Sequence, residues 1–327
     1  MKILFYDTKS YDRDSFQDTL KDFPGVEIEY TKSDLDPRTA ALAEGFDAVC
    51  AFVSSDVGVK TVEILHNKGI GLILMRCAGF NNVDMEASRK YGIRVMRVPG
   101  YSPEAVAEHA MALALAANRR LYKAYNKVRE NDFSLSGLMG FNFYEKTAGI
   151  IGTGKIGRVF IDICRGFGMN VIAYDLYPAE NSGINYVSKE ELFRNSDIIS
   201  LHCPLTEQTR YIIDEAALRL MKKSALIVNT SRGHLIDSEA LLDALNEKRI
   251  GGAALDVYEE ESGLFFEDNS DKIVTDEIIS LLVSRPNVIV TSHQAFLTEE
   301  ALANIAEVTL KNLDDYLSGK ELVNEVK

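Results

Sequence analysis

Four things are scarce or absent in this sequence, and their absence narrows the class of protein. Basic residues are outnumbered, 36 Lys and Arg against 49 Asp and Glu, and the resulting net charge of -13 argues against a nucleic-acid surface, which needs a basic stripe. No apolar run approaches the roughly 18 residues that a membrane-spanning helix requires, so no membrane contact is expected. Internal repeats and low-complexity tracts are also missing.

Cysteine is the fourth scarce component. The four cysteines, at 50, 77, 164 and 203, form no C-x-x-C pair and have no matching histidine pattern. This spacing predicts buried free thiols in a reducing compartment, and neither disulfides nor a metal site is expected. The chain begins with KILFYD, where Asp7 interrupts any signal-peptide core. A cytoplasmic protein is therefore predicted.

Short apolar runs and helix-like stretches alternate along most of the chain. With 327 residues, about two domains are expected. The predicted strands are 2–6, 26–30, 48–52, 71–75, 94–98, 148–151, 170–174, 185–187, 197–202, 225–229, 253–257 and 288–292. The helical stretches between them include 12–21, 59–67, 84–90, an alanine-rich helix capped by Ser102, a helix that starts with a capping box at 188–191, 214–221, 238–246 and 298–317. Strand and helix in alternation predict the α/β class, with two doubly wound parallel sheets.

A glycine-rich turn between a predicted strand and a helix is the clearest motif. Residues 152–157 read GTGKIG, which matches G-x-G-x-x-G. Gly152 would allow the tight turn, Gly154 would let the backbone approach a pyrophosphate, and Gly157 would let the helix lie close to the sheet. The helix N-terminus would offer free N–H groups to the phosphates.

An acidic residue completes this motif. Asp175 ends the next predicted strand, 18 positions after Gly157, where it could accept hydrogen bonds from an adenosine ribose. Its carboxylate would repel the extra phosphate of NADP, and the following Leu176 and Tyr177 provide no cation. The motif therefore predicts NAD as the cofactor. The alternative is an α/β turn that binds nothing, with Asp175 as a strand-end cap.

Polar residues gather at the ends of later predicted strands, where a doubly wound sheet binds its ligands. His293 follows an apolar run and suits an acid–base role, because its ordinary pKa lies near 6.5. Arg232 could grip a carboxylate with two parallel hydrogen bonds. A carboxylate of the run Glu259–Glu261 could orient the histidine, but spacing does not choose among the three. The structural alternatives are that His293 is a packed histidine, that Arg232 forms a surface ion pair, and that 259–276 is a solvated acidic loop. His109 is interpreted as a packed helix residue.

Six sequence blocks together resemble the D-2-hydroxyacid dehydrogenase family. They are RCAGFNNVD (76–84), VPGYSPEAVAEHA (98–110), the nucleotide motif, NTSRG (229–233), ALDVYEEE (254–261) and SHQAFLTEEAL (292–302). RCAGFNNVD, FFEDNS (265–270) and HQAFLTEEAL (293–302) most resemble the fermentative NAD-dependent D-lactate dehydrogenases of that family. The resemblance covers nearly the whole chain.

The resemblance implies a role for each matched residue. It assigns Arg232 to the carboxylate and carbonyl of a 2-oxo acid, His293 to protonation of the alkoxide, and Glu261 to holding His293. Substrate contacts are implied for Ala78, Gly79, Tyr101 and Phe296. Cofactor contacts are implied for Gly152, Thr153, Gly154, Lys155, Ile156, Gly157, Asp175, Cys203, Pro204, Thr209, Thr230 and Asp256.

The resemblance also implies domain boundaries, an assembly and an activity. A discontinuous, flavodoxin-like substrate domain would comprise 1–101 and 298–327, and a Rossmann-type NAD-binding domain would comprise 102–297. A homodimer or homotetramer is expected, with the alanine-rich helix as a candidate contact surface. The expected reaction is the reduction of pyruvate to D-lactate with NADH. The alternatives are a larger 2-oxo acid, such as phenylpyruvate or 2-oxoisocaproate, and a cofactor-sensing transcriptional regulator of the same fold.

Overall fold

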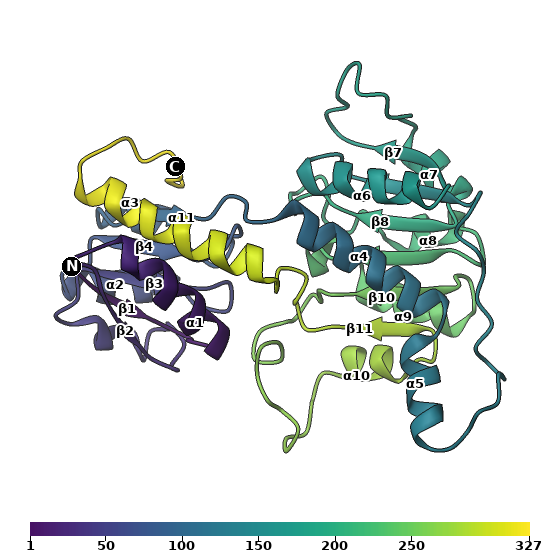
Figure 1. Ribbon diagram of the computed structural model, residues 1–327, viewed down its shortest axis with the longest axis horizontal. Helices are drawn as coiled ribbons and strands as arrows, with labels where there is room; N and C mark the ends of the chain where they lie inside the picture. The colour runs from purple at the N-terminus through teal and green to yellow at the C-terminus, as the bar shows by residue number, and fades with distance from the viewer. The chain divides into compact units, whose positions relative to one another are not determined.

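Two parallel sheets organise the chain (Figure 1). The computed structural model describes residues 1–327 and divides them into two units, 1–102 with 296–327, and 103–295. All pairings between the strands of each sheet are parallel. The predicted α/β class with two doubly wound parallel sheets is therefore confirmed. The substrate and cofactor roles given to the two domains stay predictions at this point.

The first unit is built on a five-stranded sheet. Its elements are β1 (Lys2–Phe5), α1 (Ser10–Thr19), η1 (Leu20–Asp22), β2 (Glu27–Tyr30), η2 (Ala40–Ala43), β3 (Ala48–Ala51), α2 (Val59–Asn67), β4 (Leu72–Met75), α3 (Met85–Lys90), β5 (Arg94–Arg97) and α11 (Glu299–Leu317). The strand order β2-β1-β3-β4-β5 is that of flavodoxin-like sheets. Helix α11 packs against α1, β4 and β5, so the C-terminal end of the chain belongs to this unit.

The second unit is built on a six-stranded sheet. Its elements are α4 (Pro103–Asn118), α5 (Leu121–Arg129), β6 (Thr147–Ile151), α6 (Lys155–Gly166), β7 (Asn170–Tyr174), α7 (Lys189–Asn195), β8 (Ile198–Leu201), α8 (Glu215–Leu220), β9 (Leu226–Asn229), η3 (Gly233–Leu235), α9 (Ser238–Asn246), β10 (Gly252–Leu255), α10 (Glu277–Ser284) and β11 (Val288–Val290). The strand order is β11-β10-β9-β8-β6-β7. The strand predicted over 185–187 is reduced to a single parallel bridge between Ala173 and Tyr186.

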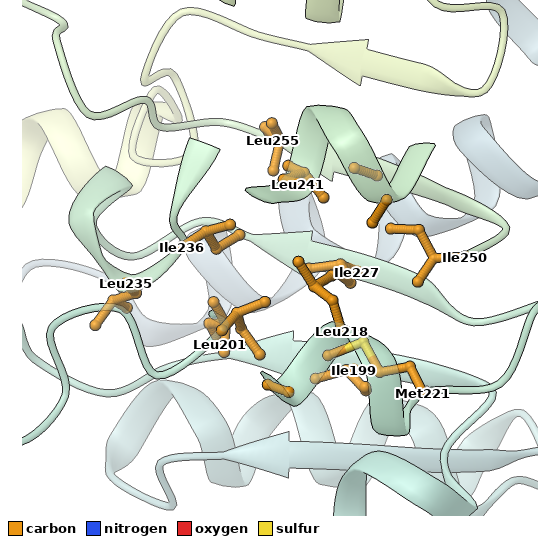
Figure 2. Packing of buried hydrophobic residues seen from close by; sticks show 14 of the residues in the cluster. Ile199, Leu201, Leu218, Met221, Ile227, Leu235, Ile236, Leu241, Ile250 and Leu255 are labelled. Carbon is orange, nitrogen blue, oxygen red and sulfur yellow. The ribbon is translucent and has the colours of Figure 1, made fainter. Parts of the chain in front are cut away.

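Apolar side chains cover both faces of the second sheet. On one face, Leu218 and Met221 pack over Ile199 of β8 and Ile227 of β9, with Leu241 of α9 beside them (Figure 2). On the other face, α4 and α6 pack together over β6, β9 and β10. Each fully buried Leu or Ile contributes about 1.5–3 kcal/mol. Because both faces are covered by apolar side chains, polar functional groups are accessible only at the edges of the sheet.

The alanine-rich helix α4 packs within its own unit. Ala107, Ala110, Ala114 and Ala117 are almost fully buried, and α4 lies against α6. Small side chains allow this close approach of the two helices. The contact surface predicted for α4 in an assembly is therefore largely used inside the chain.

Two helices were not predicted from the sequence. Helix α5 has no buried residue, and its apolar Leu121, Tyr125 and Val128, which recur at helical spacing on an exposed face, were not recognised as a helix signal. Helix α10 follows the acidic stretch, and its N-cap Asp276 accepts a hydrogen bond from the Ile279 amide at 3.1 Å. The other predicted elements lie within about two residues of those found.

All four cysteines are buried free thiols, as predicted. No helix is long and apolar enough to cross a membrane. The cytoplasmic location stays a prediction.

Gly157 offers a test of the turn between β6 and α6. A Cβ at this position would collide with the Gly152 carbonyl oxygen, which is backbone and cannot move freely. We expect Gly157→Ala to lower the free energy of unfolding by about 1–3 kcal/mol, measured by urea denaturation. Gly166→Ala in the same helix is the control, since its Cβ would meet nothing within 4 Å. Equal stability of the two variants would contradict the tight contact.

Candidate functional site

The glycine-rich turn has the geometry that a pyrophosphate needs. Gly152 has φ +94°, and a Cβ there would lie 2.6 Å from the Cys203 amide nitrogen. Gly154 differs, because a Cβ at that position would meet nothing within 4 Å. The open space beside Gly154, at the N-terminus of α6, leaves room for a ligand at the positive end of the helix dipole.

Asp175 is fixed by hydrogen bonds from both sides. Its Oδ2 accepts from the amide of Thr153 at 2.7 Å and from the Thr153 hydroxyl at 2.8 Å, and Oδ1 accepts from the Tyr177 amide at 2.9 Å. Burial alone would raise the pKa of this carboxyl, but these donors and the nearby Arg158 charge lower it on balance. Asp175 is therefore an ionised carboxylate held at the strand end, where a ribose is expected.

A cavity of about 290 Å³ opens beside this turn. Six residues predicted as cofactor contacts or as the ribose acid line it: Gly152, Gly154, Asp175, Cys203, Pro204 and Thr209. Residues that were not predicted complete the wall: Ile151, Tyr174, Leu176, Tyr177, His202, Thr206, Gln208 and Ile212. The wall is largely apolar with polar groups at Asp175 and Thr206–Thr209, which suits an adenine ring joined to a ribose.

Two titratable side chains in this wall are uncharged. Burial lowers the pKa of His202 to about 3, and burial raises the pKa of the Cys203 thiol to about 12. The His202 ring contacts Phe160 in a tilted arrangement, with 4.9 Å between centroids. Neither group is ionised near neutral pH, so this part of the wall suits an uncharged base.

The remaining predicted cofactor residues lie outside that wall. The hydroxyl of Thr230, after β9, is buried and has no hydrogen-bond partner, which leaves a donor for a ligand. Lys155 is exposed and Ile156 half-buried, both in the first turn of α6. Within the wall, Thr209 uses its hydroxyl inside its own loop, donating to the Pro204 carbonyl at 2.6 Å. An NAD molecule fits these groups, with the phosphates at the turn and the ribose at Asp175.

The acid–base candidate and one of the three glutamates are in contact. Nδ1 of His293 lies 2.8 Å from Oε2 of Glu261, whose Oε1 accepts from the Tyr258 amide at 2.9 Å. Glu259 instead accepts from the Ser238 amide, and Glu260 is exposed. The choice that spacing left open therefore falls on Glu261. With Nδ1 engaged, Nε2 is the nitrogen left for a substrate.

His293 occupies a strained backbone conformation. Its φ is +54°, in the left-handed region that costs a non-glycine residue of order 1–3 kcal/mol. Asp256 opposes this strain. It is fully buried, its carbonyl accepts from the His293 amide at 2.7 Å, and its carboxylate accepts from the amides of Gln294 and Ala295 at 3.0 and 2.9 Å. The cofactor contact predicted for Asp256 stays a prediction.

Arg232 lies at the end of β9 in a loop packed against the segment that contains Glu261. A Cβ on Gly233 would collide with the Tyr258 carbonyl, so the two loops touch backbone to backbone. Asn229 closes the Arg232 loop, donating to the Arg232 carbonyl at 2.9 Å and accepting from the Ser231 amide at 3.0 Å. Contacts thus connect Gly233, the residue after Arg232, to Tyr258, then Tyr258 to Glu261, and Glu261 to His293.

In the first unit, the loop after β4 presents backbone amides. The carbonyls of Cys77, Ala78 and Gly79 each accept a hydrogen bond from a protein donor: the Val98 amide at 3.2 Å, Arg97 Nη1 at 2.8 Å and the Cys77 thiol at 3.2 Å. With the carbonyls engaged, the amides of Ala78 and Gly79 are the groups left to bind an anion. Arg97 was not predicted as a functional residue, although its position at the end of β5, where such residues gather, could have identified it.

Aromatic rings surround Phe296 in the same unit. Its centroid lies 6.3 Å from that of Tyr101, the other predicted side-chain contact. Phe52 and Tyr11, which were not predicted, lie 6.0 and 6.4 Å from it. Phe52 immediately follows β3, and this strand-end position could have identified it.

Comparison with known proteins agrees with this geometry. A family model described as D-isomer specific 2-hydroxyacid dehydrogenase, NAD binding domain, matches residues 111–295. A D-lactate dehydrogenase of Escherichia coli K12 is 47% identical over the whole of both chains. These matches confirm the predicted family and the NAD cofactor.

Solved structures agree over the full length. The pyruvate reductase of Chlamydomonas reinhardtii has a TM-score of 0.94 and 43% identity, covering 99% of this chain and 98% of its own. D-2-hydroxyisocaproate dehydrogenase has a TM-score of 0.87 and 36% identity, covering 100% of this chain and 99% of its own. The relatives are enzymes, which argues against the regulator alternative. The chain belongs to the D-isomer specific 2-hydroxyacid dehydrogenase family and is an NAD-binding oxidoreductase.

Proposed function

We propose that this protein reduces pyruvate to D-lactate with NADH, and that the reaction is reversible. The observation that carries the proposal is the His293–Glu261 contact of 2.8 Å, which leaves one imidazole nitrogen for a substrate oxygen. Relatives named D-lactate dehydrogenase and pyruvate reductase, at 47% and 43% identity, support pyruvate as the 2-oxo acid. The D configuration of the product is inferred from the names of those relatives.

Each of the three polar residues would do one task. Bound NADH supplies the hydride for the carbonyl carbon. Arg232 would bind the substrate carboxylate through two parallel hydrogen bonds and polarise the adjacent carbonyl. His293 would give its Nε2 proton to the oxygen as negative charge develops there, and Glu261 would stabilise the imidazolium form that donates it. The amides of Ala78 and Gly79 would add donors for the carboxylate.

An aromatic cluster lies in the first unit. Rings of Tyr11, Phe52 and Tyr101 lie within 6.4 Å of the Phe296 ring, measured between centroids. Tyr101 and Phe296 are proposed to border the substrate side chain.

A panel of 2-oxo acids tests the function. We expect kcat/KM with NADH to be highest for pyruvate, and lower by about 10–200-fold for 2-oxoisocaproate and phenylpyruvate. Chiral chromatography of the product should give D-lactate alone. A higher kcat/KM for a larger acid would replace pyruvate with that acid as the substrate.

Exposed apolar residues support an oligomer. Leu121, Tyr125 and Val128 of α5 are 52–63% exposed and share one helix face, and Leu135 and Met139 are 83% and 91% exposed. We infer that a second copy of the chain covers this surface in a homodimer or homotetramer, since monomers rarely leave such patches open.

The inferred surface is testable by mass in solution. We expect the wild type to have at least twice the 36.4 kDa chain mass by light scattering, and Leu135→Asp to shift it toward the single-chain mass. Leu42→Asp is the control, because Leu42 is also exposed but lies in the first unit. If Leu135→Asp kept the wild-type mass, the interface would not lie at α5 and its neighbours.

Asp175 should set the choice between NADH and NADPH. Replacing it with Asn keeps the shape but removes the charge that would repel a 2′-phosphate. We expect the ratio of kcat/KM for NADPH to that for NADH to rise about tenfold. Glu180→Gln removes the same charge from an exposed site nearby and should leave the ratio unchanged. If both variants respond alike, the discrimination is a general charge effect.

Arg232→Lys should separate substrate binding from cofactor binding. Lysine keeps the charge but loses the two-pronged contact, so KM for pyruvate should rise about 10–100-fold while KM for NADH changes little. Steady-state kinetics with each substrate varied measures both. Arg219→Lys, on the exposed face of α8, serves as control. Equal losses for both substrates would assign Arg232 to the fold or the cofactor.

His293→Ala should abolish most turnover without loss of NADH binding. A positioned general acid contributes about 10²–10⁴-fold, so kcat should fall by that factor. Fluorescence titration should give a Kd for NADH close to the wild-type value. His66→Ala removes an exposed histidine in the first unit and should be fully active. Retention of a tenth of wild-type activity by His293→Ala would argue against an obligatory acid.

A further inference from the structure

His109 makes contacts that its apolar helix does not explain. It lies in α4, whose alanines pack against α6, and its own side chain is only 18% exposed. Its Nε2 lies 3.3 Å from Thr291 Oγ1 and 3.3 Å from Asp256 Oδ1. A helix from the start of this unit thus reaches the loop that follows its last strand.

The residues that His109 contacts determine the course of the 291–295 loop. Thr291 Oγ1 donates to Asp256 Oδ1 at 2.5 Å, and the same oxygen accepts from the Gln294 amide at 3.0 Å. Oδ2 accepts from the Ala295 amide, and the Asp256 carbonyl accepts from the His293 amide. Asp256 therefore binds the loop on both sides of His293, whose φ of +54° needs such support.

Hydrogen-bond chemistry fixes the role of His109 in this cluster. The Asp256 carboxylate only accepts, and Thr291 gives its single hydroxyl proton to that carboxylate. Nε2 of His109 must therefore bear a proton, which it shares between Thr291 and Asp256. Burial would raise the pKa of Asp256, but the donors, with His109 the largest contributor among them, keep it low. The buried anion thus has a donor from a separate helix.

We propose that His109 is a positioning residue: through Thr291 and Asp256 it holds the 291–295 loop so that the His293 imidazole meets Glu261 and the substrate oxygen. This inference rests on the proposed role of His293 as the proton donor. It concerns the placement of His293 and is separate from the predicted contact between Asp256 and the cofactor.

Four variants test the inference: His109→Leu, His109→Gln, His293→Ala, and His109→Leu combined with His293→Ala. Leucine removes the donor, whereas the glutamine amide can donate from nearly the same place as Nε2. A small displacement of a catalytic group can cost about 10²-fold, so His109→Leu should lower kcat at least tenfold. His109→Gln should recover to within about threefold of wild type, and the Kd for NADH should stay within about twofold.

The combined variant separates this role from others. If His109 acts through His293, adding His109→Leu to His293→Ala should cause no further loss of kcat. A multiplicative loss in the double variant, a parallel rise in the Kd for NADH, or failure of glutamine to rescue would each overturn the inference. Should His109→Leu unfold, Thr291→Val removes the same link, with Thr291→Ser as the rescue. Wild-type turnover by His293→Ala would instead refute the proposed function, so the two failures are distinguishable.

Discussion

Parallel strand pairing in the second sheet is the constraint on which the functional arrangement depends. Because β6, β8, β9, β10 and β11 all run in one direction, their carboxyl ends meet at one edge. Each strand there leads into a loop with a polar residue: the glycine turn, the His202 loop, the Arg232 loop, Asp256 and His293. Asp256 and His293, which are 37 positions apart in sequence, are in contact for this reason.

At that edge, backbone contacts set the geometry more than side chains do. Gly233 lets the Arg232 loop rest directly on Tyr258, whose amide holds Glu261 in turn. Asp256 uses every acceptor it has to bind the next loop and support the left-handed His293. An imidazole held this way is preorganised, which is the condition under which proton donation is efficient. The local strain is offset by buried hydrogen bonds.

Charge is distributed to suit an anionic substrate and cofactor on an acidic protein. The net charge of -13 repels anions at long range, so anion binding needs local donors, such as the helix N-terminus at Gly154 and, as proposed, Arg232. Asp175 is the exception, since its negative charge is proposed to disfavour a cofactor with the additional phosphate. His202 and Cys203 remain neutral because burial disfavours their charged forms.

The sequence by itself determined the fold class, the nucleotide turn and the cofactor, because these follow from short-range patterns: strand alternation, glycine spacing and an acid at a fixed distance. Resemblance to a family added Glu261, which spacing could not separate from Glu259 and Glu260. Only tertiary structure decided that Glu261 touches His293, that α4 packs on α6, and that His109 is part of a polar cluster and not simply packed. Helices α5 and α10, the ring of Phe52 and the donor Arg97 were also missed. The roles of Phe52 and Arg97 depend on contacts between distant segments, which leave no periodic trace in the chain, whereas α5 carries an apolar helical spacing that was not recognised.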